Sequence, residues 1–345
     1  MSLHSEILEQ AQVLERLVQE QMGHVERIAR ELRKAAPAYV FLAARGTSDN
    51  AGRYANYLWG SANGLPVALA TPSLFTFYER PPQLRGALVV GISQSGQSPD
   101  IVSVLEEAHR QGCLTLAIVN APDSPLAQAA DFVINVQAGV EAAVAATKTY
   151  TAELMAIAML SVTLQRDAAQ RQALALVPGW VQQALALDEH IARIAERYRY
   201  MSHCVVIGRG YNYATAFEWS LKLKELTYLV AEPYSSADFR HGPIAMVERG
   251  FPVMAVTPGG KVYDDLLELL KRVRQELLAE LLVISDQPEA LALAQSPLAL
   301  PQGIPEWLTP LVAIVPAQLF AYHLTLVRGL DAEQPRTIRK VTETH

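Results

Sequence analysis

The chain has 345 residues, of which half are hydrophobic and 19% are charged, and its formal net charge is −6. This length exceeds one ordinary hydrophobic core and predicts two domains, and the negative charge argues against nucleic acid or an anionic membrane as a partner. Two isolated cysteines, Cys113 and Cys204, supply neither a disulfide framework nor zinc-binding spacing. Because we see no secretory leader and no apolar run of membrane-spanning length, we expect a cytoplasmic protein.

The predicted elements form a helical lead-in followed by alternating strands and helices. Residues 1–35 have the spacing of an amphipathic helix, and residues 179–200 are expected to form a helical connector. Short apolar runs predict strands at 40–43, 67–70, 87–92, 114–119 and 132–136, and again at 205–207, 253–256, 281–284 and 298–300. This alternation predicts an α/β fold with mostly parallel, doubly wound sheets, which bind ligands beyond the carboxyl ends of their strands.

The two halves of the chain repeat one pattern. Arg45-Gly46 corresponds to Arg209-Gly210, and at the same offset Gly96 corresponds to Gly260. Chance similarity between αβ units is the alternative, and the shared order and offset argue against it. The predicted domains are therefore two tandem α/β units at 36–185 and 186–330, preceded by the lead-in and followed by a tail at 331–345.

The turn after the third predicted strand has the composition of a phosphate-binding loop. Residues 93–98 read Ser-Gln-Ser-Gly-Gln-Ser, and Ser98 followed by Pro99 predicts a helix start, where free N–H groups attract an anion. Thr47 and Ser48, after the first strand, are expected at the same edge of the sheet. Because the loop itself has no lysine or arginine, we expect a phosphate monoester rather than a nucleotide polyphosphate. The alternative is an ordinary hydroxyl-rich turn.

The predicted helix at 215–230 has two polar faces. Glu218, Lys222 and Glu225 recur at i, i+4 and i+7, so they share one face. The opposite face carries Ser220, Lys224 and Thr227. A surface helix needs only one polar face, so we expect one of the two to point inward at a cleft, where carboxylates and an ammonium can move protons. The alternative for Glu218 and Lys222 is an exposed ion pair at i,i+4 spacing.

Other motifs for nucleotides or metals fail. The run Gly208-Arg-Gly210-Tyr-Asn-Tyr213 lacks the last glycine of a dinucleotide-binding fingerprint, and no P-loop exists. No two of the eight histidines have metal-ligand helical spacing together with a carboxylate. We therefore expect neither a metal nor a cofactor.

Together these motifs resemble the SIS (sugar isomerase) family of phosphosugar-binding domains, which implies two flavodoxin-like units. Within that family the chain is similar to the isomerase half of glutamine–fructose-6-phosphate aminotransferase (glucosamine-6-phosphate synthase). The motifs that carry the resemblance are Arg-Gly-Thr-Ser at 45–48, the loop at 93–98, Ala-Ala-Thr-Lys at 145–148, Glu-x-x-x-Lys-x-Lys-Glu at 218–225, Asp-Phe-Arg-His-Gly-Pro at 238–243, Asp-x-x-Gln-Pro-Arg at 331–336, and Glu-Ile-Leu-Glu-Gln at 6–10.

The resemblance implies a role for each matching residue. Phosphate binding is implied for Ser48, Ser93, Gln94, Ser95 and Ser98, with Thr47 beside them, and backbone contacts to the sugar are implied near Val144. Glu225 matches the carboxylate that moves a proton between C1 and C2, and Lys222 and Glu218 match its neighbours. His241 matches the acid/base of ring opening, supplied by the other subunit of a homodimer. Lys340 matches the tail lysine that covers the sugar and forms an imine with the open-chain ketose.

Two departures from the family pattern concern sugar specificity. Arg45 stands where the family has a cysteine, and Ala146 stands where it has a serine that contacts the sugar. The sequence also lacks a counterpart of the synthase's glutaminase domain, so glutamine hydrolysis is not expected.

The arrangement is similar to that of stand-alone SIS deaminases, which implies conversion of glucosamine 6-phosphate to fructose 6-phosphate and ammonia. The alternatives are another phosphosugar isomerase, a fructosamine-phosphate deglycase, or a non-catalytic sugar-phosphate sensor. The expected partners are a hexose or hexosamine 6-phosphate and a second copy of the chain.

Overall fold

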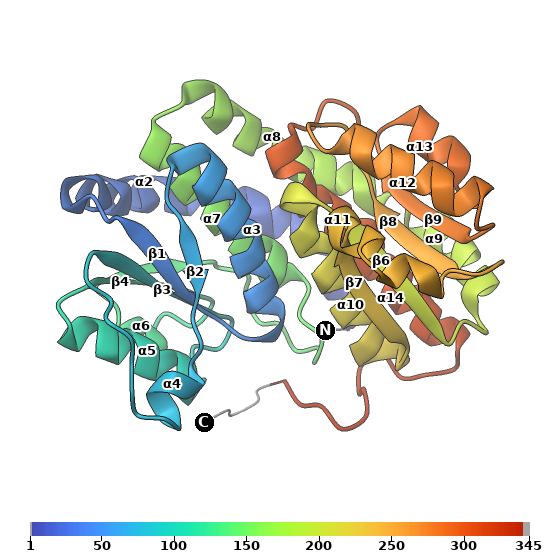
Figure 1. Cartoon of the computed structure of the whole chain (residues 1–345). Coiled ribbons are helices and arrows are strands. Elements are labelled where there is room, and N and C mark those ends of the chain that lie inside the picture. The colour runs from blue at the N-terminus through green and yellow to red at the C-terminus, as the bar shows by residue number, and fades with distance from the viewer. Residues whose placement is uncertain (1, 341–345) are drawn as a thin grey trace. The chain divides into compact units, whose positions relative to one another are not determined.

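The computed structural model describes residues 2–340, which form two compact units, each assembled from separate stretches of chain (Figure 1). The first unit comprises Gln12–Ala142, Lys148–Leu176 and, among the described residues, Arg339 and Lys340. The second comprises residues 2–11, Ala143–Thr147 and Val177–Ile338. The units therefore interleave along the sequence, because the chain crosses between them more than once.

The first unit is a five-stranded parallel sheet with the order β2-β1-β3-β4-β5. Helices α5 and α6 share a buried core cluster with Val89 and Ala117 of one sheet face, whereas α3 packs against Leu42, which points to the other face. Its elements are α2 (Gln10–Ala35), β1 (Tyr39–Ala43), α3 (Gly46–Asn63), β2 (Val67–Leu69), α4 (Ser73–Thr76), β3 (Ala87–Ser93), α5 (Pro99–Arg110), β4 (Leu114–Val119), α6 (Pro125–Gln128), β5 (Phe132–Asn135) and α7 (Lys148–Gln165).

The second unit repeats this topology, with the parallel order β10-β9-β8-β6-β7. Helix α8 (Ala168–Leu185) links the two sheets along the chain. The elements are α1 (Leu3–Leu8), α9 (Asp188–Ala195), β6 (His203–Gly208), α10 (Tyr213–Thr227), β7 (Val230–Ser235), α11 (Ser236–Arg240), β8 (Pro252–Val256), α12 (Tyr263–Gln275), β9 (Glu280–Ser285), α13 (Pro288–Leu293), β10 (Ser296–Ala299) and α14 (Thr309–Val327). Short 3-10 turns lie at Glu196–Tyr198, Gly210–Asn212, Pro243–Met246 and Glu306–Leu308. The prediction of two doubly wound α/β units is confirmed.

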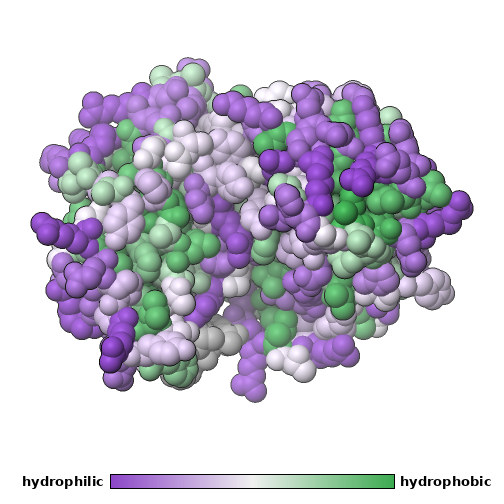
Figure 2. All heavy atoms as spheres, viewed as in Figure 1, coloured by the Kyte–Doolittle hydropathy of each residue, from purple (hydrophilic) through white to green (hydrophobic). Residues whose placement is uncertain are grey.

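Both sheets are buried on both faces, as parallel sheets are when helices cover them. Every residue of β3 is buried, and α14 is apolar all around. Among the described residues, one helix, Glu306–Val327, is long and apolar enough to cross a membrane, but 78% of its most apolar window is buried inside the protein. That burial is typical of a core helix. On the visible face, hydrophilic side chains are widespread, with smaller apolar areas between them (Figure 2).

The structure corrects the prediction of a helix at 215–230. Helix α10 ends at Thr227, since Tyr228 adopts a left-handed conformation with φ of 60°. Strand β7 then begins at Val230, which the sequence analysis missed. The strand contains Pro233, which has no N–H for a sheet hydrogen bond and is tolerated because β7 lies at the sheet edge.

Candidate active site

The predicted phosphate loop in the first unit is a tight turn between β3 and α5. Its serines organise the backbone: Gly96 N–H donates to Ser93 Oγ at 3.0 Å, and Gln97 N–H donates to Ser95 Oγ at 3.3 Å. Ser98 is the N-cap of α5 but makes no side-chain cap bond, so its hydroxyl is not used to close the helix. The N-terminus of a twelve-residue helix therefore faces a turn of hydroxyl groups, an arrangement that suits an anion.

Two constraints explain why the middle of this loop is glycine. Gly96 has φ of 62°, and a Cβ at this position would lie 2.0 Å from Ser124 Oγ. We expect Gly96→Ala to lower the free energy of unfolding by about 3 kcal/mol, because left-handed strain and overpacking add. Gly112→Ala is the matched control, since Gly112 has φ of 72° and open space around its Cβ position, so about 1 kcal/mol is expected. Urea denaturation measures both variants; equal losses would contradict the steric explanation.

The second polar turn lies at the neighbouring strand of the same sheet edge. Strand β1 pairs with β3 in parallel, with Ala43 opposite Gly91, and Thr47 and Ser48 follow in the first turn of α3. Ser48 is buried and donates its hydroxyl proton to Glu153 Oε1 at 2.9 Å. The expected adjacency of the two turns is thus present, and a buried carboxylate already orients one of its hydroxyl groups.

Arg45 brings a positive charge to this edge that the loop itself lacks. Its Nε donates to Asp100 Oδ2 at 2.7 Å, and the Asp100 side chain, in the first turn of α5, is fully buried. The Arg45 side chain is 47% exposed. A guanidinium is therefore anchored between the starts of α3 and α5.

In the second unit the charged face of α10 points inward. The side chains of Glu218 and Lys222 are 0% and 1% exposed, so the alternative of a surface ion pair is wrong. Lys222 Nζ lies 3.4 Å from Glu218 Oε1 and 2.5 Å from Glu225 Oε2. Glu225 is 24% exposed, so one carboxylate of the cluster reaches solvent while the ammonium behind it does not.

The opposite face of α10 is polar without being a charged site. Ser220 Oγ donates to the carbonyl of Ala231 at 2.7 Å, and Thr227 Oγ1 donates to the carbonyl of Leu223 within the helix. Lys224 is exposed. These hydroxyl groups satisfy backbone acceptors, which explains how the second polar face packs against the edge strand β7.

His241 follows α11 and is exposed. The preceding segment is held by Asp265, which accepts hydrogen bonds from Ser236 and Arg240 and forms an ion pair with Arg209. Partial burial acts to raise the pKa of Asp265, but the three donors together hold it below its ordinary value. The acid/base candidate is therefore a solvent-facing imidazole at the end of an anchored helix.

Lys340 in the first unit has a buried partner. Its Nζ donates to Glu141 Oε2 at 2.7 Å, and the Glu141 side chain is fully buried. Glu141 also accepts bonds from the backbone N–H and the hydroxyl of Thr149, at 3.1 and 2.7 Å. The end of the described tail is thus held by a carboxylate that is itself fixed at the start of α7.

The predicted site residues fall into groups within each unit. The first unit brings together Thr47, Ser48 and the loop 93–98 at one sheet edge, and it also holds Lys340. The second brings together Glu218, Lys222 and Glu225, while Val144 is half-buried in the separate segment Ala143–Thr147.

Sequence reasoning missed the acidic partners Glu141, Glu153 and Asp100. Glu141 and Glu153 each stand alone in an apolar stretch, which is a usable signal because a carboxylate buried there requires a donor. Their partners cannot be deduced in the same way, since Ser48 and Glu153 are 105 residues apart and Lys340 and Glu141 are 199 apart.

Comparison with known families supports a common origin for both units. The model of the SIS domain matches residues 32–163 and again residues 199–328. The matches therefore cover both sheets.

Two solved structures resemble nearly the whole chain. The C-terminal domain of glucosamine-fructose-6-phosphate aminotransferase from Francisella tularensis is 30% identical, with a TM-score of 0.88, covering 96% of this chain and 98% of that one. A Silicibacter pomeroyi protein, provisionally assigned as a phosphosugar isomerase, is 32% identical, with a TM-score of 0.86, covering 96% and 100%.

Among curated sequences, glutamine–fructose-6-phosphate aminotransferase from Aquifex aeolicus is 35% identical over 306 residues. The match covers 87% of this chain but 51% of that protein. The chain thus spans about half the length of the curated relatives it matches.

Proposed function

We propose, from the premise that the chain belongs to the SIS domain family, that it is an aminosugar-phosphate deaminase/isomerase. The proposed reaction converts glucosamine 6-phosphate and water to fructose 6-phosphate and ammonia. The observation that carries the proposal is the inward Glu218–Lys222–Glu225 cluster, in which a buried ammonium contacts a carboxylate that reaches solvent. We also propose that the protein acts in the cytoplasm and as a homodimer, in which His241 of one subunit acts in the site of the other.

The proposed chemistry is a proton transfer followed by hydrolysis. After His241 opens the ring, Glu225 takes the proton from C2 and a proton is delivered to C1, while the amino nitrogen loses a proton and O1 gains one. The amino aldose thereby becomes the C2 imine of the ketose. The C2–N bond then breaks and ammonia leaves, and one water molecule finally supplies the keto oxygen at C2. One sugar phosphate and one water thus give one ketose phosphate and one ammonia, with no change in net oxidation state.

Lys340 has a separate proposed role at C2. Its amine replaces ammonia in the imine, and water then releases the ketose and restores the lysine. The contact between Nζ and the buried Glu141 carboxylate, at 2.7 Å, supports the proposal because it holds the end of the lysine side chain in a defined place. Glu218 and Lys222 are proposed to position Glu225.

The phosphate is proposed to bind to Ser48, Ser93, Gln94, Ser95 and Ser98, with Thr47 beside them. The backbone near Val144 is proposed to contact the sugar. The second unit supports this choice of unit, because its corresponding turn after β8 is filled by the chain's own carboxylates. Gly259 N–H donates to Asp286 at 2.7 Å and Lys261 N–H donates to Glu306 at 3.0 Å. At the position in the first unit that corresponds to Lys261, the Gln97 N–H donates instead to the Ser95 hydroxyl at 3.3 Å, which supports the first unit as the one that binds the phosphate.

A panel of sugar phosphates with product NMR tests the proposal against its alternatives. A deaminase yields fructose 6-phosphate from glucosamine 6-phosphate, a plain isomerase interconverts sugars without ammonia, and a deglycase releases an amine from a sugar–amine adduct. The partly exposed Glu225 beside Lys222 favours an enzyme over a sugar-phosphate sensor. Saturable binding without turnover of any panel member would instead favour the sensor.

Lys340→Ala is expected to harm catalysis more than binding. We predict a fall in kcat of about 10²-fold or more with KM changed by less than about threefold, because the imine step is lost while the phosphate turn remains intact. Steady-state kinetics with glucosamine 6-phosphate measures both constants. Arg339→Ala is the neighbouring control, and an unchanged kcat for Lys340→Ala would reject the imine role.

A further inference from the structure

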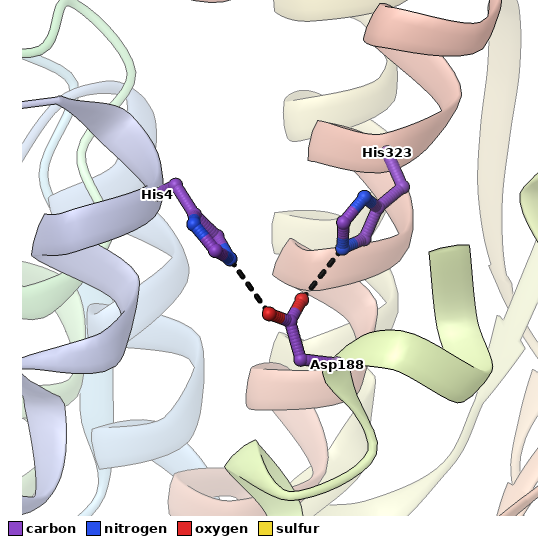
Figure 3. Close-up of side chains that lie close together, drawn as sticks. All are labelled: His4, Asp188 and His323. Carbon is purple, nitrogen blue, oxygen red and sulfur yellow. Dashed lines mark hydrogen bonds and ion pairs between the residues drawn. The ribbon is translucent and has the colours of Figure 1, made fainter.

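Three side chains from distant parts of the sequence lie close together in the second unit (Figure 3). Asp188, the first residue of α9, lies between His4 of α1 and His323 of α14. His4 Nε2 is 2.8 Å from Asp188 Oδ2, and His323 Nε2 is 2.6 Å from Asp188 Oδ1. The metal-ligating atoms of the three side chains all lie within 4.8 Å of one another.

The local fold holds the cluster in place before any ligand is present. The His4 ring stacks on Tyr322, with ring centroids 4.8 Å apart and planes 6° from parallel. Leu3 is fully buried, and its N–H donates to both carboxylate oxygens of Glu333 at 2.9 Å. Helix α1 is therefore fixed on both sides of His4, so little side-chain freedom would be lost on binding an ion.

From this geometry we propose that His4, Asp188 and His323 form a binding site for a divalent transition-metal ion of the zinc type. Two imidazole nitrogens and one carboxylate oxygen suit such ions, whereas Mg²⁺ and Ca²⁺ favour oxygen ligands alone. The side chains are 14–29% exposed, so an ion can reach them and water can complete the coordination. Binding requires each Nε2 lone pair, so a proton on Nε2 moves to Nδ1 or leaves to solvent.

This site differs from the expectation of no metal, which rested on the lack of helical spacing between histidines. Here the ligands are 184 and 135 residues apart, and only the fold brings them together. A bound ion would join α1, α9 and α14 of the second unit. Since an ion that binds only the folded state stabilises it, the site would act as a structural clamp whose effect does not depend on the proposed catalytic function.

Zinc binding by the 345-residue chain tests the proposal. Metal is first removed with a chelator and dialysis. When ZnCl₂ is then added, we expect one Zn²⁺ to bind per chain, and saturating ZnCl₂ should raise the unfolding temperature by roughly 5 °C. Asp188→Asn and His323→Ala should each weaken Zn²⁺ binding at least about tenfold. His190→Ala is the matched control, because His190 is an exposed histidine on the same helix as Asp188, and it should bind as the unaltered protein does.

A second measurement separates loss of a metal ligand from misfolding of the variant. Co²⁺ in place of Zn²⁺ should give a visible absorption spectrum of nitrogen and oxygen coordination that His4→Gln changes, while circular dichroism of that variant stays native. Absence of stoichiometric Zn²⁺ binding would overturn the proposal and leave a hydrogen-bonded His–Asp–His cluster. Unchanged Zn²⁺ affinity in Asp188→Asn, His323→Ala and His4→Gln would also overturn it, because the ion would then bind elsewhere.

Discussion

Glu225→Gln should reduce kcat for ammonia release from glucosamine 6-phosphate by about 10²- to 10⁴-fold, the range expected for loss of a positioned general base. The amide keeps the shape of the carboxylate but cannot accept the C2 proton. Binding of the sugar phosphate should persist within about threefold, because the proposed phosphate ligands belong to the loop 93–98 and to Thr47 and Ser48. Turnover by coupled assay and affinity by calorimetry measure the two effects.

The control for this variant is Glu232→Gln, which makes the same change at an exposed position of β7, and kinetics of the unaltered protein are expected. Full activity of Glu225→Gln would remove Glu225 from the proposed mechanism. Loss of both activity and binding would give Glu225 a structural role instead, since Lys222 Nζ contacts its carboxylate at 2.5 Å.

Lys222→Met should lower the free energy of unfolding by about 3–5 kcal/mol, because removing one partner of a buried ion pair leaves an uncompensated charge. Lys222 and Glu218 are 1% and 0% exposed, so water cannot replace the lost ammonium without opening the packing around α10. Methionine conserves most of the volume, which makes the lost charge the main change. Urea denaturation measures the effect.

Two further variants separate charge from packing at this position. Lys224→Met makes the same change two residues away on an exposed position of α10, and it should alter the free energy of unfolding by about 0.5 kcal/mol or less. Glu218→Leu combined with Lys222→Met should recover part of the loss, because both buried charges are then gone. Equal effects of Lys222→Met and Lys224→Met would contradict the burial argument.

The main features of the fold could be predicted because its signals are local. Strands β1, β3 and β4 are continuous short apolar runs, because helices cover both faces of the sheet and successive side chains on both faces must be apolar. Strand β7 was missed for the opposite reason: an edge strand that contains Pro233 carries no such signal. The end of α10 was misplaced because the left-handed conformation falls on Tyr228, a residue type that rarely adopts it.

The candidate site could be predicted only as far as local patterns reach. Periodicity identified the charged face of α10, and the composition of residues 93–98 predicted an anion-binding turn, a role that stays a proposal. The pairings of Arg45 with Asp100 and of Lys340 with Glu141 depend on contacts made by the folded chain, which neither spacing nor composition encodes. Whether a carboxylate such as Glu153 is buried against a hydroxyl likewise follows from packing.

Simultaneous measurement of ammonia and fructose 6-phosphate from glucosamine 6-phosphate, with no glutamine added, tests the proposed function most directly. The proposal predicts equal molar amounts of the two products, formed by the unaltered protein and not by Glu225→Gln. Failure of the unaltered protein to release ammonia from any hexosamine phosphate would contradict it.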